Sequence, residues 1–197
     1  MRRRSLLRLL PAALVLALPA CDRTAPTYFS IDITGADYGR DFRLTDPSGK
    51  ERTLADFRGM VVMLFFGFTQ CPDVCPTALA RAVEVRNRLG ADGERVQVVF
   101  VTVDPERDTP IVLKEYTAAF DPSFLGLYGD AEHTKVVARE FRVIYQKVPT
   151  GSSYTMDHTA LTFVFDSQGR LRLAVRHEQS ADQLAADLRM LIKSSSP

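Results

Sequence analysis

Only three cysteines and three histidines occur among the 197 residues, and tryptophan is absent. Three cysteines are too few for a miniature domain held together by disulfides. The 25 Lys and Arg residues nearly balance the 24 Asp and Glu residues, so the formal net charge of +1 argues against a strongly basic nucleic-acid binder. The sequence also lacks a Gly-rich phosphate loop and a Gly-x-Ser-x-Gly element. It therefore offers no basis for nucleotide chemistry or serine hydrolysis.

Long apolar runs are also missing. The N-terminal run, residues 9–20, is shorter than the roughly 20 residues that a membrane-spanning helix needs. Hydrophobic residues make up 46% of the chain and charged residues 25%, which is typical of a globular protein and not of a disordered or polytopic membrane protein. The length suits one domain of ordinary size.

The first twenty residues are predicted to be a secretory signal peptide, because a basic stretch, residues 1–8, precedes the apolar run. Residues 18–21, Leu-Pro-Ala-Cys, resemble a bacterial lipoprotein box, which predicts that Cys21 is lipidated and becomes the new N-terminus. A plain secretory signal with an incidental Cys21 is the alternative. We expect an exported, membrane-anchored protein facing the periplasm, with residues 21–27 as a linker.

Residues 28–197 are predicted to form a single α/β domain. Two continuous apolar runs, residues 60–66 and 96–103, indicate buried central strands. Further strands are expected at 142–148, 161–165 and 171–175, and shorter extended segments at 28–33, 42–45, 52–54 and 124–128. Helices are expected at 76–89, 109–120, 131–141 and 180–192.

This order of elements, a β-α-β beginning with a later β-hairpin and a closing helix, is typical of a thioredoxin-like fold. We therefore expect a central mixed sheet flanked by helices, preceded by an N-terminal extension.

Cys71 and Cys75 are the most informative residues. They lie four positions apart where a buried strand leads into a long helix, and the free N–H groups of a helix N-terminus favour thiolates. At this spacing in a regular helix the Cβ atoms are about 5–6 Å apart, and a disulfide needs about 3.5–4.5 Å. Pro72 and Pro76 make a loosened first turn credible. The pair is expected to hold a metal ion or to form a disulfide; two buried structural cysteines are the alternative.

The Cys-x3-Cys spacing differs from the Cys-x2-Cys of thioredoxins and of structural zinc sites, so a metal would need a third ligand. His158 is the preferred candidate, because it lies in a polar loop that directly precedes an apolar strand and the thioredoxin plan places that loop beside the dithiol. His133 and His177 are expected to be solvated residues at the ends of elements. Two thiolates and an imidazole suit Cu(I), and Zn²⁺ or Cu(II) can use the same groups.

Three motifs together resemble the Sco/SenC family: Cys-Pro-Asp-Val-Cys-Pro at 71–76, Val-Asp-Pro-Glu-Arg-Asp-Thr-Pro at 103–110, and Asp-His-Thr at 157–159. The resemblance implies a thioredoxin-like, membrane-tethered protein that binds one copper ion and helps to assemble the CuA centre of cytochrome c oxidase. It implies Cys71, Cys75 and His158 as the copper ligands, with a lipid on Cys21 in place of a transmembrane anchor. The implied partners are a copper-accepting oxidase subunit and a further copper donor.

Charged residues beside these motifs are candidates for supporting roles. Asp73 and Asp157 flank the predicted ligands and are interpreted as partners of the ligands or as docking charges, with plain solvation as the alternative. Asp104, Arg107 and Asp108 are expected to form a helix-capping turn with a local ion pair.

Four functions remain open from the residues alone. The first is a copper chaperone, and the second is a thiol-disulfide oxidoreductase in which Cys71 and Cys75 cycle as a redox-active dithiol to reduce an exported partner. Metal delivery requires His158, whereas dithiol exchange should tolerate its loss. A peroxiredoxin-like peroxidase leaves Cys75 and His158 unexplained, and a non-catalytic interaction domain leaves the whole constellation unexplained.

Overall fold

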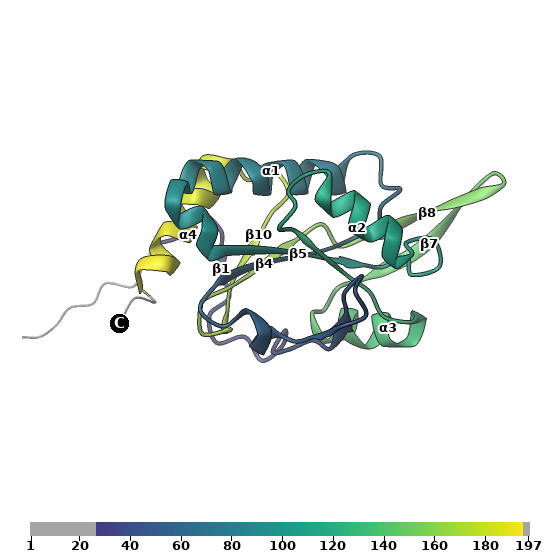
Figure 1. The fold of residues 1–197 in the computed structure, drawn as a ribbon, viewed down its shortest axis with the longest axis horizontal. Helices are drawn as coiled ribbons and strands as arrows, with labels where there is room; N and C mark the ends of the chain where they lie inside the picture. Colours follow the sequence, from purple (N-terminus) through teal and green to yellow (C-terminus); the bar gives the residue numbers. More distant parts are fainter. Residues whose placement is uncertain (1–26, 195–197) are drawn as a thin grey trace, which may run out of the picture.

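A mixed sheet forms the centre of the molecule in this computed structural model, which describes residues 27–194 (Figure 1). Within that range the sheet has six strands in the order β1-β10-β9-β4-β5-β6. The pairs β4–β5 and β5–β6 are parallel, and the other pairs are antiparallel. The bounds are β1 Ile31–Asp32, β4 Val61–Gly67, β5 Val96–Thr102, β6 Leu125–Leu127, β9 Thr162–Phe165 and β10 Leu171–Val175. The expected central mixed sheet is therefore present.

Strand β4 lies at the middle of the sheet because its residues suit burial on both faces. All seven of its residues are buried, as expected for a continuous apolar run between two neighbouring strands. Phe65 pairs with Phe100 of β5, and Leu64 pairs with Phe163 of β9. The C-terminal end of β4 thus leads from the core directly to the segment that carries the two cysteines.

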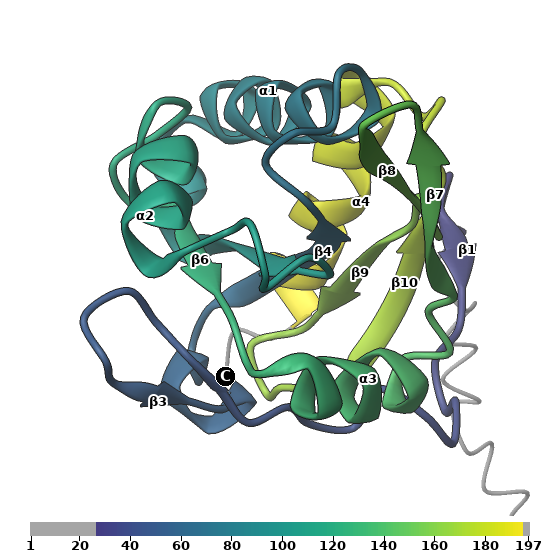
Figure 2. The same ribbon diagram turned by 90° about the vertical axis from the view of Figure 1, so that its right-hand side faces the viewer.

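Helices cover both faces of the sheet (Figures 1 and 2). Helices α1 (Val74–Leu89), α2 (Pro110–Ala118) and α4 (Ala181–Ser194) lie on one face, and α3 (Ala131–Glu140) lies on the other. The 3₁₀ helices η1 and η2 span Leu54–Phe57 and Gly90–Arg95. Side chains start two of the helices: Thr109 accepts a hydrogen bond from the N–H of Val112, and Asp130 accepts one from the N–H of His133.

Helix α1 begins two residues earlier than predicted, at Val74 instead of Pro76. Cys75 therefore lies in the first turn of α1, and Cys71 lies in the loop before it. A proline in the first turn of a helix costs no hydrogen bond, so Pro76 does not delay the start.

Two small antiparallel pairs lie outside the main sheet. Strand β2 (Leu44–Thr45) pairs with β3 (Glu51–Arg52), and β7 (Tyr145–Thr150) pairs with β8 (Ser153–His158) in a hairpin that projects from the domain (Figure 1). The predicted loop around His158 is therefore a strand. The strand predicted at 142–148 starts later because Arg142, with φ 54°, ends the turn after α3. Cross-strand pairing makes β8 extended although its own residues are polar.

The N-terminal extension is bound to the C-terminal helix. The buried carboxylate of Asp187 accepts hydrogen bonds from the N–H of Phe29 at 2.9 Å, the N–H of Ser30 at 2.8 Å and the hydroxyl of Ser30 at 2.6 Å. The predicted signal peptide, Cys21 and most of the predicted linker lie outside the described residues. Within residues 27–194, no helix combines the length and the apolar character needed to cross a membrane.

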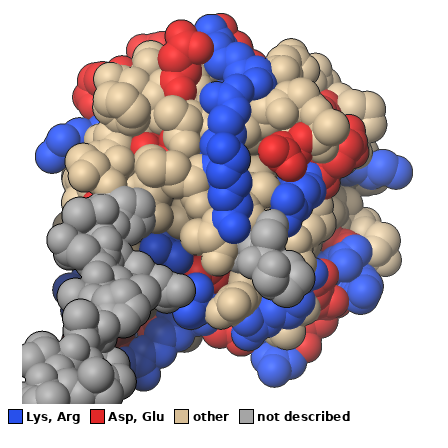
Figure 3. Space-filling model, turned by 90° about the vertical axis from the view of Figure 1, so that its left-hand side faces the viewer, with Lys and Arg blue, Asp and Glu red and all other residues tan. Residues whose placement is uncertain are grey.

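Charges of both signs alternate on the end of the molecule opposite the hairpin. Figure 3 shows a narrow band of Lys and Arg side chains there with acidic groups beside it. Arg88, near the end of α1, illustrates the pattern, because it forms ion pairs with Glu84 at 2.5 Å and with Asp182 of α4 at 2.6 Å.

Candidate metal centre

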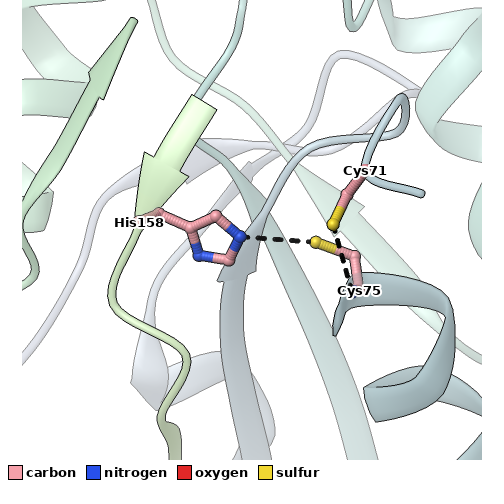
Figure 4. Close-up of side chains that lie close together, drawn as sticks. All are labelled: Cys71, Cys75 and His158. Carbon is pink, nitrogen blue, oxygen red and sulfur yellow. Dashed lines mark hydrogen bonds between the residues drawn. The ribbon is translucent and has the colours of Figure 1, made fainter. Parts of the chain in front are cut away.

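Three soft or borderline donor atoms converge at one end of the sheet. The sulfur atoms of Cys71 and Cys75 and a ring nitrogen of His158 all lie within 4.8 Å of one another (Figure 4). Cys71 comes from the loop after β4, Cys75 from the first turn of α1, and His158 from the end of β8. Both cysteines are free thiols; Cys75 is buried and Cys71 is partly exposed. The structure thus brings together the three residues singled out as ligands.

The two thiols differ in acidity. The hydrogen bond from the Cys75 thiol, together with the N–H groups of Asp73 and Cys75, lowers the pKa of Cys71 to about 5. The Cys75 N–H lies 3.4 Å from the Cys71 sulfur. The pKa of Cys75 is raised, first because its thiol donates to Cys71 and second because it is buried. Cys71 is therefore the thiolate of the reduced pair, and the start of α1 stabilises its charge.

The imidazole of His158 is oriented for binding. Its Nδ1 lies 3.1 Å from the carbonyl oxygen of Thr159, which only accepts hydrogen bonds, so Nδ1 carries the proton. Nε2 then faces the sulfur of Cys75, 3.5 Å away. The rings of Phe65 and Phe68 contact the imidazole nearly edge-on, each with its centroid 5.9 Å from the imidazole. The tautomer and the orientation suit a metal ligand.

Gly67, the last residue of β4, provides the space for the buried thiol. A Cβ atom at this position would lie 2.7 Å from the sulfur of Cys75 and 2.8 Å from the ring of Phe100. The sequence analysis assigned no role to Gly67. The available signal was a glycine inside an apolar strand, which often marks a close approach to the backbone.

The turn at 104–108 connects the cysteine loop to the body of the domain. Asp104 and Arg107 form the predicted ion pair, with 2.5 Å between Oδ2 and Nε. The residue that caps α2 is Thr109, directly after this turn, and neither aspartate caps the helix. Asp108 is buried instead, and it accepts hydrogen bonds from the N–H and the hydroxyl of Thr69 and from the hydroxyl of Thr102. Burial raises the pKa of Asp108.

Asp73 and Asp157, which are neighbours of the ligands in the sequence, are both exposed. The side chain of Asp73 does not cap α1, but its backbone N–H donates to the Cys71 sulfur. Asp157 lies opposite Gln146 in the hairpin. Their roles as ligand partners or docking charges stay predictions.

Other residues near the site have structural roles or lie apart from it. His133 is exposed at the start of α3 and His177 follows β10, so neither belongs to the cluster. Tyr116 of α2 packs on Phe100 with ring centroids 5.5 Å apart. Its hydroxyl is buried without a hydrogen-bond partner among the described residues, and burial, with the nearby thiols, raises its pKa.

The fold and the cluster define a class: a thioredoxin-like domain in which a Cys-x3-Cys pair and one histidine can hold a single metal ion. The family model described as SCO1/SenC matches residues 32–193. The chain belongs to the SCO1/SenC family, which confirms the resemblance found in its motifs.

Relatives and solved structures agree with this assignment. The chain is 40% identical over 153 residues to the mitochondrial SCO2 homologue of Bos taurus, covering 76% of this chain and 58% of that protein. It thus spans less than two thirds of the length of this curated relative. The structure of Bradyrhizobium japonicum ScoI with copper bound is 43% identical, with a TM-score of 0.71, and the match covers 79% of this chain and 99% of that one.

A more distant structure shows the fold alone. BsSco, a member of the Sco family of cytochrome c oxidase assembly proteins, is 23% identical with a TM-score of 0.64, and the match covers 83% of this chain and 98% of that one. These similarities confirm the thioredoxin-like fold expected from the order of elements.

Proposed function

We propose that this chain binds one copper ion through the sulfur atoms of Cys71 and Cys75 and the Nε2 of His158, and that it acts as a membrane-tethered copper chaperone in the assembly of the CuA site of cytochrome c oxidase. The observation that carries the proposal is the convergence of these three atoms within 4.8 Å. The copper bound to the related ScoI and the membership in the SCO1/SenC family support it.

The donor set suits copper. Thiolates select Cu(I), and imidazole is a common copper ligand. Cys71 is already a thiolate at neutral pH, whereas Cys75 keeps its proton in the metal-free protein. Copper binding therefore releases the proton of Cys75 to solvent, and affinity should rise with pH.

Release to a partner follows from the unequal burial of the ligands. Cys75 is completely buried, while Cys71 and His158 are partly exposed. An acceptor thiol or imidazole can approach from the side of Cys71 and His158 and replace them one at a time, with Cys75 released last. The proposed acceptor is a copper-binding subunit of the oxidase, and a further protein would donate the copper.

Tethering is the part of the proposal that rests on the N-terminal sequence. A lipid on Cys21 would hold the domain at the periplasmic surface of the membrane, with residues 21–27 as a short linker. Mass spectrometry of the membrane fraction would detect the added diacylglyceryl group on an N-terminal Cys21 peptide. An unmodified Cys21 in the mature protein would remove the tether from the proposal.

Reduction of a partner disulfide is the second candidate function, favoured by the unequal acidity of the two thiols. The Cys71 thiolate would attack one partner sulfur and release the other as a thiolate, forming a mixed disulfide. Cys75, losing its proton, would then attack the Cys71 sulfur and release the second partner thiol. Two electrons pass to the partner, and a Cys71–Cys75 disulfide remains.

An anaerobic Cu(I) titration of the reduced full chain in mild detergent, against a competing chelator, tests the proposal. We expect one tightly bound copper per chain, weaker binding in His158→Ala and none in the Cys71→Ser, Cys75→Ser double variant. His133→Ala is the matched control, because this histidine is exposed and lies outside the cluster. A parallel Zn²⁺ titration measures selectivity. Absence of tight copper binding in a wild-type protein with a readily oxidised dithiol would instead favour the reductase.

A further inference from the structure

Arg107 contacts both segments that carry the ligands. Its Nη1 donates to the side-chain oxygen of Gln70 at 3.0 Å, directly before Cys71. The same nitrogen donates to the backbone oxygen of Tyr154 at 2.8 Å, on the strand that ends at His158. One guanidinium thus connects the cysteine loop to the histidine hairpin.

The groups that hold Arg107 in place are largely buried. The Arg107 side chain is only 17% exposed, and it pairs with Asp104, which is 1% exposed. The Asp104 carboxylate also accepts a hydrogen bond from the Tyr154 hydroxyl at 2.9 Å. The guanidinium carbon lies 3.7 Å from the centroid of the Tyr154 ring and 5.9 Å from that of Phe68, whose ring contacts His158.

The hairpin needs such a connection. Strands β7 and β8 pair with each other and form no ladder with the main sheet, and the hairpin projects from the domain (Figures 1 and 2). An isolated two-stranded hairpin is marginally stable in water. Met156 is the one buried residue of β8. The position of the imidazole therefore depends on the contacts that hold β8, and those made by Arg107 lie four residues from His158.

We propose that Arg107 is a positioning residue that sets the distance between the His158 imidazole and the two thiols. Its hydrogen bonds among the described residues go to Asp104, Gln70 and Tyr154 and not to a ligand, and it acts by holding β8 against the cysteine loop. The test that measures copper affinity rests on the proposed function. The inference can also be tested without copper, because it concerns the placement of a ring in the metal-free protein.

The copper test is a double-mutant cycle in the full chain. Arg107→Met keeps the aliphatic part of the side chain and removes the charged fork, and we expect it to weaken Cu(I) binding about tenfold, as loss of groups that orient ligands does. In a His158→Ala background the same change should alter affinity less than about twofold, because no imidazole remains to be positioned. An equal loss in both backgrounds would overturn the proposal.

Arg172→Met is the matched control. Arg172 lies on β10, far from the cysteine loop, and its side chain is 14% exposed and pairs with the fully buried Asp166, which follows β9. This substitution should lower stability comparably and leave copper affinity unchanged. Arg107→Lys retains a positive charge beside Asp104 but replaces the planar guanidinium, with its several N–H donors, by a single ammonium group. It should recover stability without recovering the affinity, and full recovery of affinity would show that charge alone suffices.

The metal-free test uses proton NMR of the His158 ring. The edge-on contacts with Phe65 and Phe68 place its ring protons in the ring currents of both aromatics. Arg107→Met should move these resonances toward their random-coil values, and Arg172→Met should not. Unchanged resonances in Arg107→Met would overturn the proposal. If the wild-type protein binds no copper, the proposed function fails and this measurement alone still decides the role of Arg107.

Discussion

Substitution of Gly67 by alanine tests how tightly the site is built. The backbone of Gly67 lies in a regular strand, so alanine introduces no backbone strain there. Its methyl group would lie 2.7 Å from the Cys75 sulfur and 2.8 Å from the Phe100 ring, while ordinary contact begins at 3.4 Å. Both neighbours are completely buried and cannot swing into solvent. The change therefore forces the thiol, the ring or the strand to move.

Overpacking of this kind costs about 1–3 kcal/mol. For a domain of this size, that loss should lower the melting temperature by about 2–12 °C. Because the displaced atom is a ligand, we also expect about tenfold weaker Cu(I) binding. Thermal unfolding followed by circular dichroism would measure the first effect on the reduced, metal-free chain. Chelator competition would measure the second.

Gly126→Ala is the control for overpacking away from the thiols, because its methyl group would lie 3.1 Å from Leu113. It should lower stability and leave copper affinity unchanged. Combining Gly67→Ala with Cys75→Ala should recover part of the lost stability, since the sulfur contact disappears while the Phe100 contact remains. A Gly67→Ala protein with wild-type melting temperature and copper affinity would refute the reasoning.

Three further predictions follow from single groups. Iodoacetamide should alkylate Cys71 of the reduced protein at half its maximal rate near pH 5, and Cys75 should stay unmodified at neutral pH; equal labelling would contradict this. Burial alone would raise the pKa of Asp46, but hydrogen bonds, led by the one from Ser48, hold this pKa at about 2. About 2 kcal/mol of folding stability should therefore be lost as the pH falls from about 4 to 2. Urea titrations would measure this loss, and Asp46→Asn should abolish it. Tyr116→Phe removes a buried hydroxyl that has no hydrogen-bond partner among the described residues, so it should raise the free energy of unfolding by about 1 kcal/mol. A lower free energy of unfolding in urea titrations would show that the hydroxyl does have a partner.

Local sequence alone was sufficient for much of the fold. The apolar runs that became β4 and β5 are strand-length and buried on both faces, so pattern and burial agree. The cysteines follow β4 directly, and a strand-to-helix corner places them at the edge of the sheet. The motif spacing was specific enough to indicate the family. Cys21 and the signal peptide stay predictions, because they lie outside the described residues.

The sequence by itself determined that two thiols and a helix N-terminus occur together, because those groups are neighbours along the chain. The sequence also pointed to His158 as the third donor, but only the tertiary structure brings its imidazole to the two thiols. His158 reaches the thiols because β8 pairs with β7 and because Arg107 connects β8 to the cysteine loop. Position 67 likewise needs glycine because the thiol of Cys75, eight residues further along the chain, packs against the backbone of β4 there. Contacts of this kind depend on packing between segments. A local pattern can mark such a glycine, but it does not identify the atom that the glycine makes room for.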